Sequence, residues 1–168
     1  MKTCLSLIIA LVFAVTISAQ TASVTKITSD DLKALEGKQW VGGLTYLDYG
    51  TGKKTTIKSN LTISRSATDE LNWLFDYQYP EEPKANSKSQ LSLSTDGLIF
   101  NGETVIENTK LADGARRIVT TKPGNDNNRK ALYRFTYDIG KDKFTIRKDV
   151  LIDGTTEWFE RNTYSWTR

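Results

Sequence analysis

The residues best suited to contact a ligand form a row of aromatic side chains in which every second position is aromatic: Trp73, Phe75, Tyr77 and Tyr79. A period of two places all four on one face of an extended strand. Such a face can line an apolar ligand cavity, where tyrosine hydroxyls supply hydrogen bonds. It can also be ordinary core, because aromatic residues are good strand formers. We interpret Trp73 and Phe75 as core, and keep both uses open for Tyr77 and Tyr79 near the strand end.

A second candidate contact is the guanidinium of Arg134, which would bind a carboxylate well if it were buried inside the fold. The alternation with Tyr133 and Phe135 indicates that Arg134 points outward instead. The residues that we predict to bind a ligand are Tyr77, Tyr79, Trp73, Tyr46 and Arg134.

The chain has few of the groups that catalysis commonly uses. It contains no histidine, and its one cysteine, Cys4, lies in the N-terminal apolar segment. The nearest paired carboxylates in a strand, Glu157 and Glu160, have opposite parity and cannot jointly flank a bond. Asp126 lies among asparagines but lacks the spacing of a calcium loop. We therefore predict no catalytic residue, no metal site and no cofactor, and consider a carboxylate-based hydrolase the less favoured alternative.

The N-terminus indicates export. Lys2 precedes an apolar run from Leu5 to Ile17 that is short for a bilayer span, and Ala19 offers a small residue for cleavage. We interpret residues 1–19 as a secretory signal peptide, so the protein is expected to be periplasmic or secreted, with no membrane anchor after cleavage. Without cysteine in the remainder, the core alone must stabilise the fold.

The length and the net charge of the chain indicate how many domains it has and whether it binds nucleic acid. A chain of 168 residues suggests one domain, and its formal net charge of +3 is close to balance. The sequence has no concentrated basic stripe with interleaved aromatics, so we expect no nucleic-acid partner.

Two segments must position these residues. Residues 20–35 form a leader and a short helix, in which Ser29 is the expected cap and Gly37 ends the turn. Leu32 and Leu35 share a face that could plug one end of the fold. Residues 36–168 follow a period of two, beginning with a strand from Lys38 to Tyr49, and tight turns separate the later strands.

The strand count of about 8–10 predicts an all-β fold, an antiparallel up-and-down β-barrel with a short N-terminal helix, and a β-sandwich is the alternative. The longest expected loops are Pro80–Asn86 and Pro123–Asn128.

The short helix, the glycine, the tryptophan early in the first strand and the C-terminal arginine resemble the calycins, which include the lipocalins and the fatty-acid-binding proteins. The chain looks most like lipocalin-like exported bacterial proteins. The resemblance implies that Trp40 sits at the closed end of the barrel with Arg168, or Arg161, stacked on its indole. Gly37-Lys38-Gln39-Trp40 is one residue longer than the lipocalin G-x-W motif.

The same resemblance suggests a carboxylate-binding pair. Arg161 and Tyr164 are similar to the arginine and tyrosine that hold a fatty-acid carboxylate in intracellular lipid-binding proteins. Their separation of three residues places them on opposite faces of a strand unless a bulge intervenes.

These observations lead to two functional expectations. The first is an exported barrel that binds a small apolar or amphipathic molecule. The second is a protein- or glycan-interaction module, or an inhibitor, with the two long loops as contacts. A free interior of about 300 Å³ or more would favour the first, and an interior packed solid would favour the second.

Overall fold

The computed structural model describes residues 25–37 and 39–168, so the predicted signal peptide lies outside the described residues. Helix α1 (Ser29–Leu32) continues as the 3-10 turn η1 (Lys33–Leu35), and a second 3-10 turn, η2 (Pro83–Ala85), precedes the fourth strand. The strands are β1 (Gln39–Asp48), β2 (Lys53–Arg65), β3 (Asn72–Gln78), β4 (Ser87–Ser92), β5 (Ile99–Phe100), β6 (Glu103–Lys110), β7 (Arg116–Asp126), β8 (Arg129–Ile139), β9 (Lys143–Ile152) and β10 (Trp158–Thr167).

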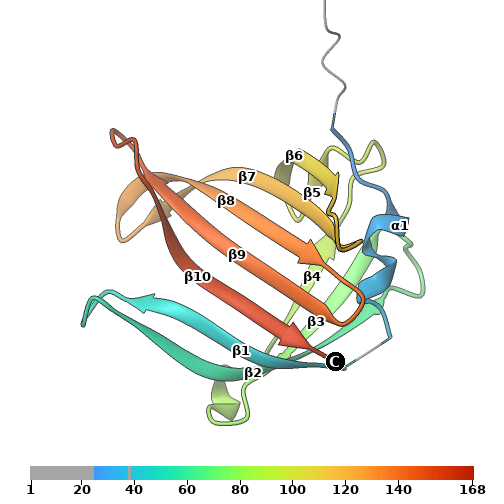
Figure 1. Ribbon diagram of the computed structural model, residues 1–168, viewed down its shortest axis with the longest axis horizontal. Coiled ribbons are helices and arrows are strands. Elements are labelled where there is room, and N and C mark those ends of the chain that lie inside the picture. The colour runs from blue at the N-terminus through green and yellow to red at the C-terminus, as the bar shows by residue number, and fades with distance from the viewer. Residues whose placement is uncertain (1–24, 38) are drawn as a thin grey trace, which may run out of the picture.

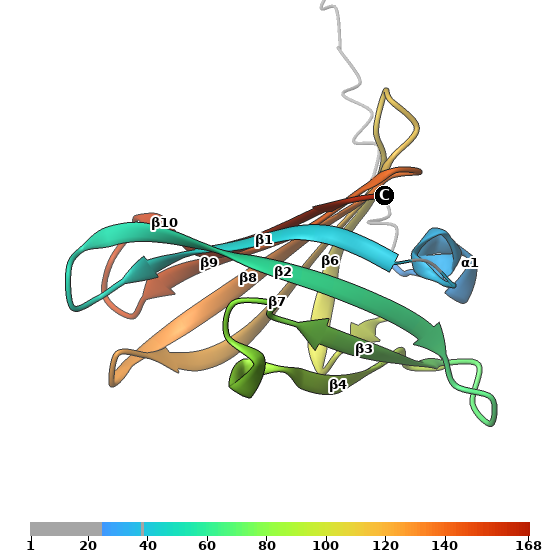
Figure 2. The same ribbon diagram turned by 90° about the horizontal axis from the view of Figure 1, so that it is seen from below.

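The ten strands form one antiparallel sheet in the order β4-β3-β2-β1-β10-β9-β8-β7-β6-β5. The first and last strands pair with each other, from Val41 opposite Thr167 to Tyr46 opposite Asn162. At the other seam, β4 and β5 are joined by a bridge between Leu93 and Phe100. The sheet curls into a nearly closed barrel (Figures 1 and 2). The predicted all-β barrel is thus confirmed, and the single continuous sheet excludes the sandwich.

The period of two explains which side chains face inward. Along β2, Leu61 and Ile63 are fully buried, whereas Thr62 between them and Ser64 after them are exposed. On β3, Trp73 and Phe75 are each 1% exposed. Alternation therefore builds the core from inward-facing rows of apolar residues.

The helix closes one end of the barrel, which we call the helix end (Figure 1). Leu32 and Leu35 are buried in the core, as their shared face predicted. Thr28, rather than Ser29, is the N-cap, because its backbone N–H donates to the Asp31 carboxylate at 2.8 Å. Gly37 follows with φ of +69°, a conformation that glycine adopts without steric cost.

Trp40 and Arg168 form the pair that the resemblance implied. The Arg168 guanidinium carbon lies 4.4 Å from the centroid of the Trp40 ring, and the indole is fully buried. Arg168 also donates to the carbonyl oxygen of Ala34 at 3.0 Å, while the Trp40 indole N–H donates to that of Leu35 at 3.2 Å. The pair thus ties the helix to β1 and β10, the first and last strands of the chain, which are neighbours in the sheet.

Replacing Arg168 with alanine is expected to lower the free energy of unfolding by about 1–2 kcal/mol, because the variant loses one cation–π contact and one hydrogen bond. Urea denaturation followed by tryptophan fluorescence measures this difference. A change below about 0.5 kcal/mol, the range of ordinary surface substitutions, would show that the stacking does not stabilise the helix end.

The structure corrects one predicted loop. Pro123 to Asp126 belong to β7 and pair with Leu132 to Arg129 on β8, so the expected loop Pro123–Asn128 is a continuation of the strand. Only Asn127 and Asn128 reverse the chain, with φ of 46° and 61°. Asparagine tolerates this left-handed conformation, and two such residues suit the twist of a hairpin. The Pro80–Asn86 segment is a loop that contains η2.

Candidate functional site

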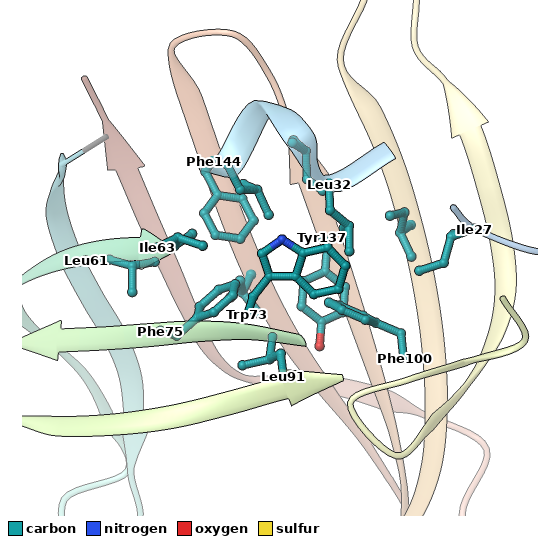
Figure 3. Close-up of a cluster of buried hydrophobic side chains, with 14 of the residues drawn as sticks. Ile27, Leu32, Leu61, Ile63, Trp73, Phe75, Leu91, Phe100, Tyr137 and Phe144 are labelled. Atoms are coloured by element: carbon teal, nitrogen blue, oxygen red, sulfur yellow. The ribbon is translucent and has the colours of Figure 1, made fainter. Parts of the chain in front are cut away.

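The barrel interior has two halves. The half beneath the helix is packed solid, and Trp73 lies in its middle with Leu32 above it (Figure 3). The Trp73 indole N–H donates to the Glu36 carboxylate at 2.9 Å, and that carboxylate also pairs with Arg65 at 2.8 Å. These partners hold Trp73 in the core, as we interpreted it from the sequence.

The other half contains a cavity of about 190 Å³. Aromatic and apolar groups of several strands form most of its wall, and a few polar groups interrupt them. The lining residues are Tyr77, Ser89, Leu91, Asn101, Phe135, Tyr137, Ile146, Lys148, Asn162 and Tyr164. We call this space the barrel cavity.

Tyrosines form one wall of the barrel cavity. The rings of Tyr77 and Tyr164 lie 5.5 Å apart, and the hydroxyls of Tyr164 and Tyr79 are 2.9 Å apart. Tyr164 in turn stacks on Trp166 with ring centroids 4.9 Å apart. Burial raises the pKa of Tyr77 and of Tyr164 above the usual tyrosine value. Both hydroxyls therefore stay neutral at physiological pH and can donate hydrogen bonds to a ligand.

The strand next to Tyr164, β9, contributes a lysine to the wall. Lys148 lies on β9 in the inward row of Phe144, Ile146 and Val150, and its ammonium sits 3.5 Å from the centroid of the Tyr133 ring. Burial lowers the pKa of Lys148. Asn162 stands directly opposite it on β10. An inward lysine next to an amide is the main polar feature of this wall.

Glu103 lies beside the cavity and is fully buried. The Tyr137 hydroxyl donates to its carboxylate at 3.0 Å, the Thr120 hydroxyl also donates to it, and the Lys122 ammonium lies 3.2 Å away. Burial raises the pKa of Glu103 above its ordinary value. The Glu103 carboxylate thus has hydrogen-bond and ion-pair partners within the protein, whereas Lys148 has no ion-pair partner among the described residues.

A polar bridge crosses the end opposite the helix. The Tyr49 hydroxyl donates to Asp126, and the Arg161 guanidinium carbon lies 4.3 Å above the Tyr49 ring. Arg161 Nε is 3.7 Å from the Asp126 carboxylate. Burial, first, and the bond to Asp126, second, raise the pKa of Tyr49 to about 12. The bridge joins the β1–β2 and β7–β8 hairpins.

The bulge on which the Arg161–Tyr164 resemblance depended is present. The register of β10 against β9 shifts between Glu160 and Asn162. Arg161 nevertheless forms an ion pair with Asp126, whereas the Tyr164 hydroxyl forms a hydrogen bond with the Tyr79 hydroxyl. The two residues therefore have separate protein partners and do not form a shared carboxylate site.

The structure does not bring the five residues that we predicted to bind a ligand together in one site. Tyr77 lines the barrel cavity, and Tyr79 reaches it through its bond to Tyr164. Tyr46 stands opposite Asn162 on β10 and is half-buried. Trp73 is core, and Arg134 lies outside, 3.2 Å from Asp149 and stacked on Trp158 at 4.3 Å.

The sequence prediction missed Lys148, Asn162, Tyr137 and Glu103. A signal for Lys148 existed, because it occupies an even position among the apolar residues Phe144, Ile146, Val150 and Ile152. A charged residue in an otherwise apolar row indicates an inward charge. Asn162 also had a signal, because it shares the parity of Tyr164 and Trp166 on the last strand; the bulge changes the facing only of the residues before it.

A larger groove of about 610 Å³ lies on the outer face of strands β6 to β10. Several of its charged side chains already neutralise one another. Arg117 makes a bidentate pair with Asp138 at 2.7 and 2.8 Å, and Arg147 pairs with Asp149 at 2.9 Å. Despite its smaller volume, the barrel cavity is the better candidate site, because its aromatic wall and convergent polar groups are typical of ligand pockets.

The fold and this interior define the chain as a nearly closed antiparallel β-barrel protein with a small aromatic cavity. No protein-family model matches the sequence, and no curated protein matches it significantly. In the part of the chain that the structure describes, no helix is long and apolar enough to span a bilayer.

Proposed function

We propose that the protein is an exported binding protein that holds a small amphipathic molecule in the barrel cavity. The observation that carries the proposal is the cavity itself, whose wall combines aromatic rings with a lysine, two asparagines and tyrosine hydroxyls. An apolar wall with a few convergent polar groups gives a ligand both affinity and orientation. The absence of histidine from the chain favours binding over catalysis.

The size of the cavity restricts the ligand. At about 190 Å³ it is below the volume of about 300 Å³ that we expected for small-molecule binding, and below the roughly 300–1,000 Å³ of pockets for drug-sized molecules, although the interior is not packed solid. A single-ring or short-chain molecule suits this volume. The barrel and the Trp40–Arg168 pair support a relationship to the calycins, many of which bind small molecules in their barrels.

Native mass spectrometry of protein purified from its host should reveal a retained small molecule, or an added one-ring probe such as 4-methylbenzamide. Replacing Ser89, which is exposed on β4 and lines the cavity, with tryptophan should weaken probe binding about tenfold or more, because the indole would occupy the space. Titration calorimetry measures the affinity.

Gln90→Trp is the matched control, because Gln90 is the neighbouring exposed residue and points to the opposite face. It should leave probe affinity within a factor of about two. Equal affinities for the wild type and for Ser89→Trp would place the ligand elsewhere, and failure of all one-ring probes to bind would overturn the proposal.

The outer groove supports a second candidate function, the binding of a protein or a glycan. Exposed Ile106, 51% accessible, lies beside the Arg117 and Arg147 ion pairs on its wall. If Ile106→Asp abolished capture of a partner while Ser89→Trp did not, this second function would be favoured.

A further inference from the structure

Among the residues that the structure describes, the barrel cavity has one cation without a counter-ion, Lys148. Five charged side chains cluster at this half of the interior: Glu103, Lys122, Asp126, Lys148 and Arg161. Lys122 pairs with Glu103 at 3.2 Å, and Arg161 approaches Asp126 at 3.7 Å. Within residues 25–37 and 39–168, Lys148 makes no ion pair, so the cluster carries one excess positive charge.

The surroundings fix the position of Lys148. Its ammonium lies over the ring of Tyr133, whose hydroxyl donates to the carbonyl oxygen of Asn125. The same ring packs on Gly124, where an added Cβ would come within 2.2 Å of the ring. Glycine at this position therefore lets Tyr133 lie close to β7 as a platform for the ammonium.

The neighbouring groups can complete an anion site. Asn162 stands directly across from Lys148, and Tyr164 lies two residues further along β10; both line the cavity. An ammonium, an amide N–H and a phenol O–H are all donors to an anionic oxygen. Phe135, Ile146 and Tyr77 supply apolar surface in the same cavity.

Lys148 is half-buried. Partial removal of an ammonium from water without a partner is unfavourable, and an anion that binds it offsets this cost. We propose that Lys148 is the anchor for a carboxylate, and that the ligand of the barrel cavity is a small monocarboxylate with an aromatic ring or a short apolar chain. This inference rests on the proposed binding function and names the chemical class of its ligand.

The experiment compares two probes of nearly equal shape, 4-methylbenzoate and the neutral 4-methylbenzamide, by titration calorimetry at low ionic strength. Wild-type protein is expected to bind the carboxylate about tenfold or more tightly than the amide, because a charge-assisted hydrogen bond is stronger than a neutral one. Lys148→Met should remove this preference and leave amide affinity within a factor of about three. Lys148→Arg should retain a preference for the carboxylate.

Lys143→Met is the matched control, since it removes a positive charge from the same strand at an exposed position outside the barrel cavity. It should keep the full preference for the carboxylate. Circular dichroism and urea denaturation would confirm that each variant is folded, and amide NMR shifts at Asn162 and Tyr164 would locate the bound probe.

The possible results separate this inference from the function on which it rests. If wild type binds both probes equally, or if Lys148→Met leaves the preference intact, the carboxylate anchor is wrong while the binding function stands. If neither probe binds at millimolar concentration, the binding function itself fails, and the anchor fails with it.

Discussion

Replacing Trp40 with alanine is expected to lower the free energy of unfolding by about 3–5 kcal/mol. The indole is fully buried, so the change would leave a large cavity at the helix end. It would also remove the indole hydrogen bond to Leu35, the stacking of Arg168 and the contact with Phe144, whose ring centroid lies 5.9 Å away. Urea denaturation followed by circular dichroism measures the loss.

Val41→Ala is the matched control for Trp40→Ala, because Val41 is the next residue on β1 and is 56% exposed. It should change the free energy of unfolding by no more than about 0.5 kcal/mol. A loss below about 1 kcal/mol for Trp40→Ala would mean that the helix end does not depend on this indole. If Trp40→Ala fails to fold, Trp40→Phe, which fills more of the space, should retain part of the stability.

The sequence predicted the barrel because alternation and turn chemistry are local signals. Leu61 and Ile63 revealed the inward face of β2, and Asn101-Gly102 marked a turn by its tolerance for positive φ. The pairing of Trp40 with Arg168 was expected from the resemblance to the calycins, and it forms because the first and last strands of the chain are neighbours in the sheet.

The candidate site was predicted less completely, because it depends on departures from regular strands. The bulge in β10 places Phe159 and Asn162 on the same face although they are three residues apart, and a bulge leaves no clear mark in the spacing of side chains. The strand through Pro123 was missed because proline and glycine usually indicate a loop. Here Tyr133 packs on Gly124 across the β7–β8 hairpin, a contact that composition alone does not reveal.

Inward charges are also difficult to predict, because most strand lysines and glutamates face solvent. Glu103 shares its face with Val105, but the shift between Val105 and Glu107 ends the alternation after only two residues. Its burial becomes evident only when Lys122 and Tyr137 from other strands are placed around it.

Replacing Glu103 with alanine is expected to lower the free energy of unfolding by about 3–5 kcal/mol near neutral pH. The carboxylate is fully buried and accepts hydrogen bonds from Thr120 and Tyr137, while Lys122 lies 3.2 Å away. Alanine would leave these groups without their shared partner inside the barrel. Urea denaturation at pH 7 measures the loss.

Two variants show whether the lost pairing is the cause. Glu107→Ala, on the same strand but lining the outer groove, should change the free energy of unfolding by at most about 0.5 kcal/mol. Glu103→Leu combined with Lys122→Met replaces the ion pair with apolar groups and should recover much of the stability. If Glu103→Ala alone were as stable as the wild type, the buried network would not stabilise the fold.

The buried carboxylate also predicts how stability depends on pH. Because burial raises the pKa of Glu103 above its ordinary value of 4.5, the folded protein holds this proton more tightly than the unfolded chain does. The resulting stabilisation is fully present below pH 4.5 and is lost as pH rises through the folded-state pKa. Glu103→Gln carries no such proton, so its free energy of unfolding should improve relative to wild type as pH increases. Urea denaturation of both proteins from pH 4 to pH 8 tests this, and a constant difference across that range would contradict the raised pKa.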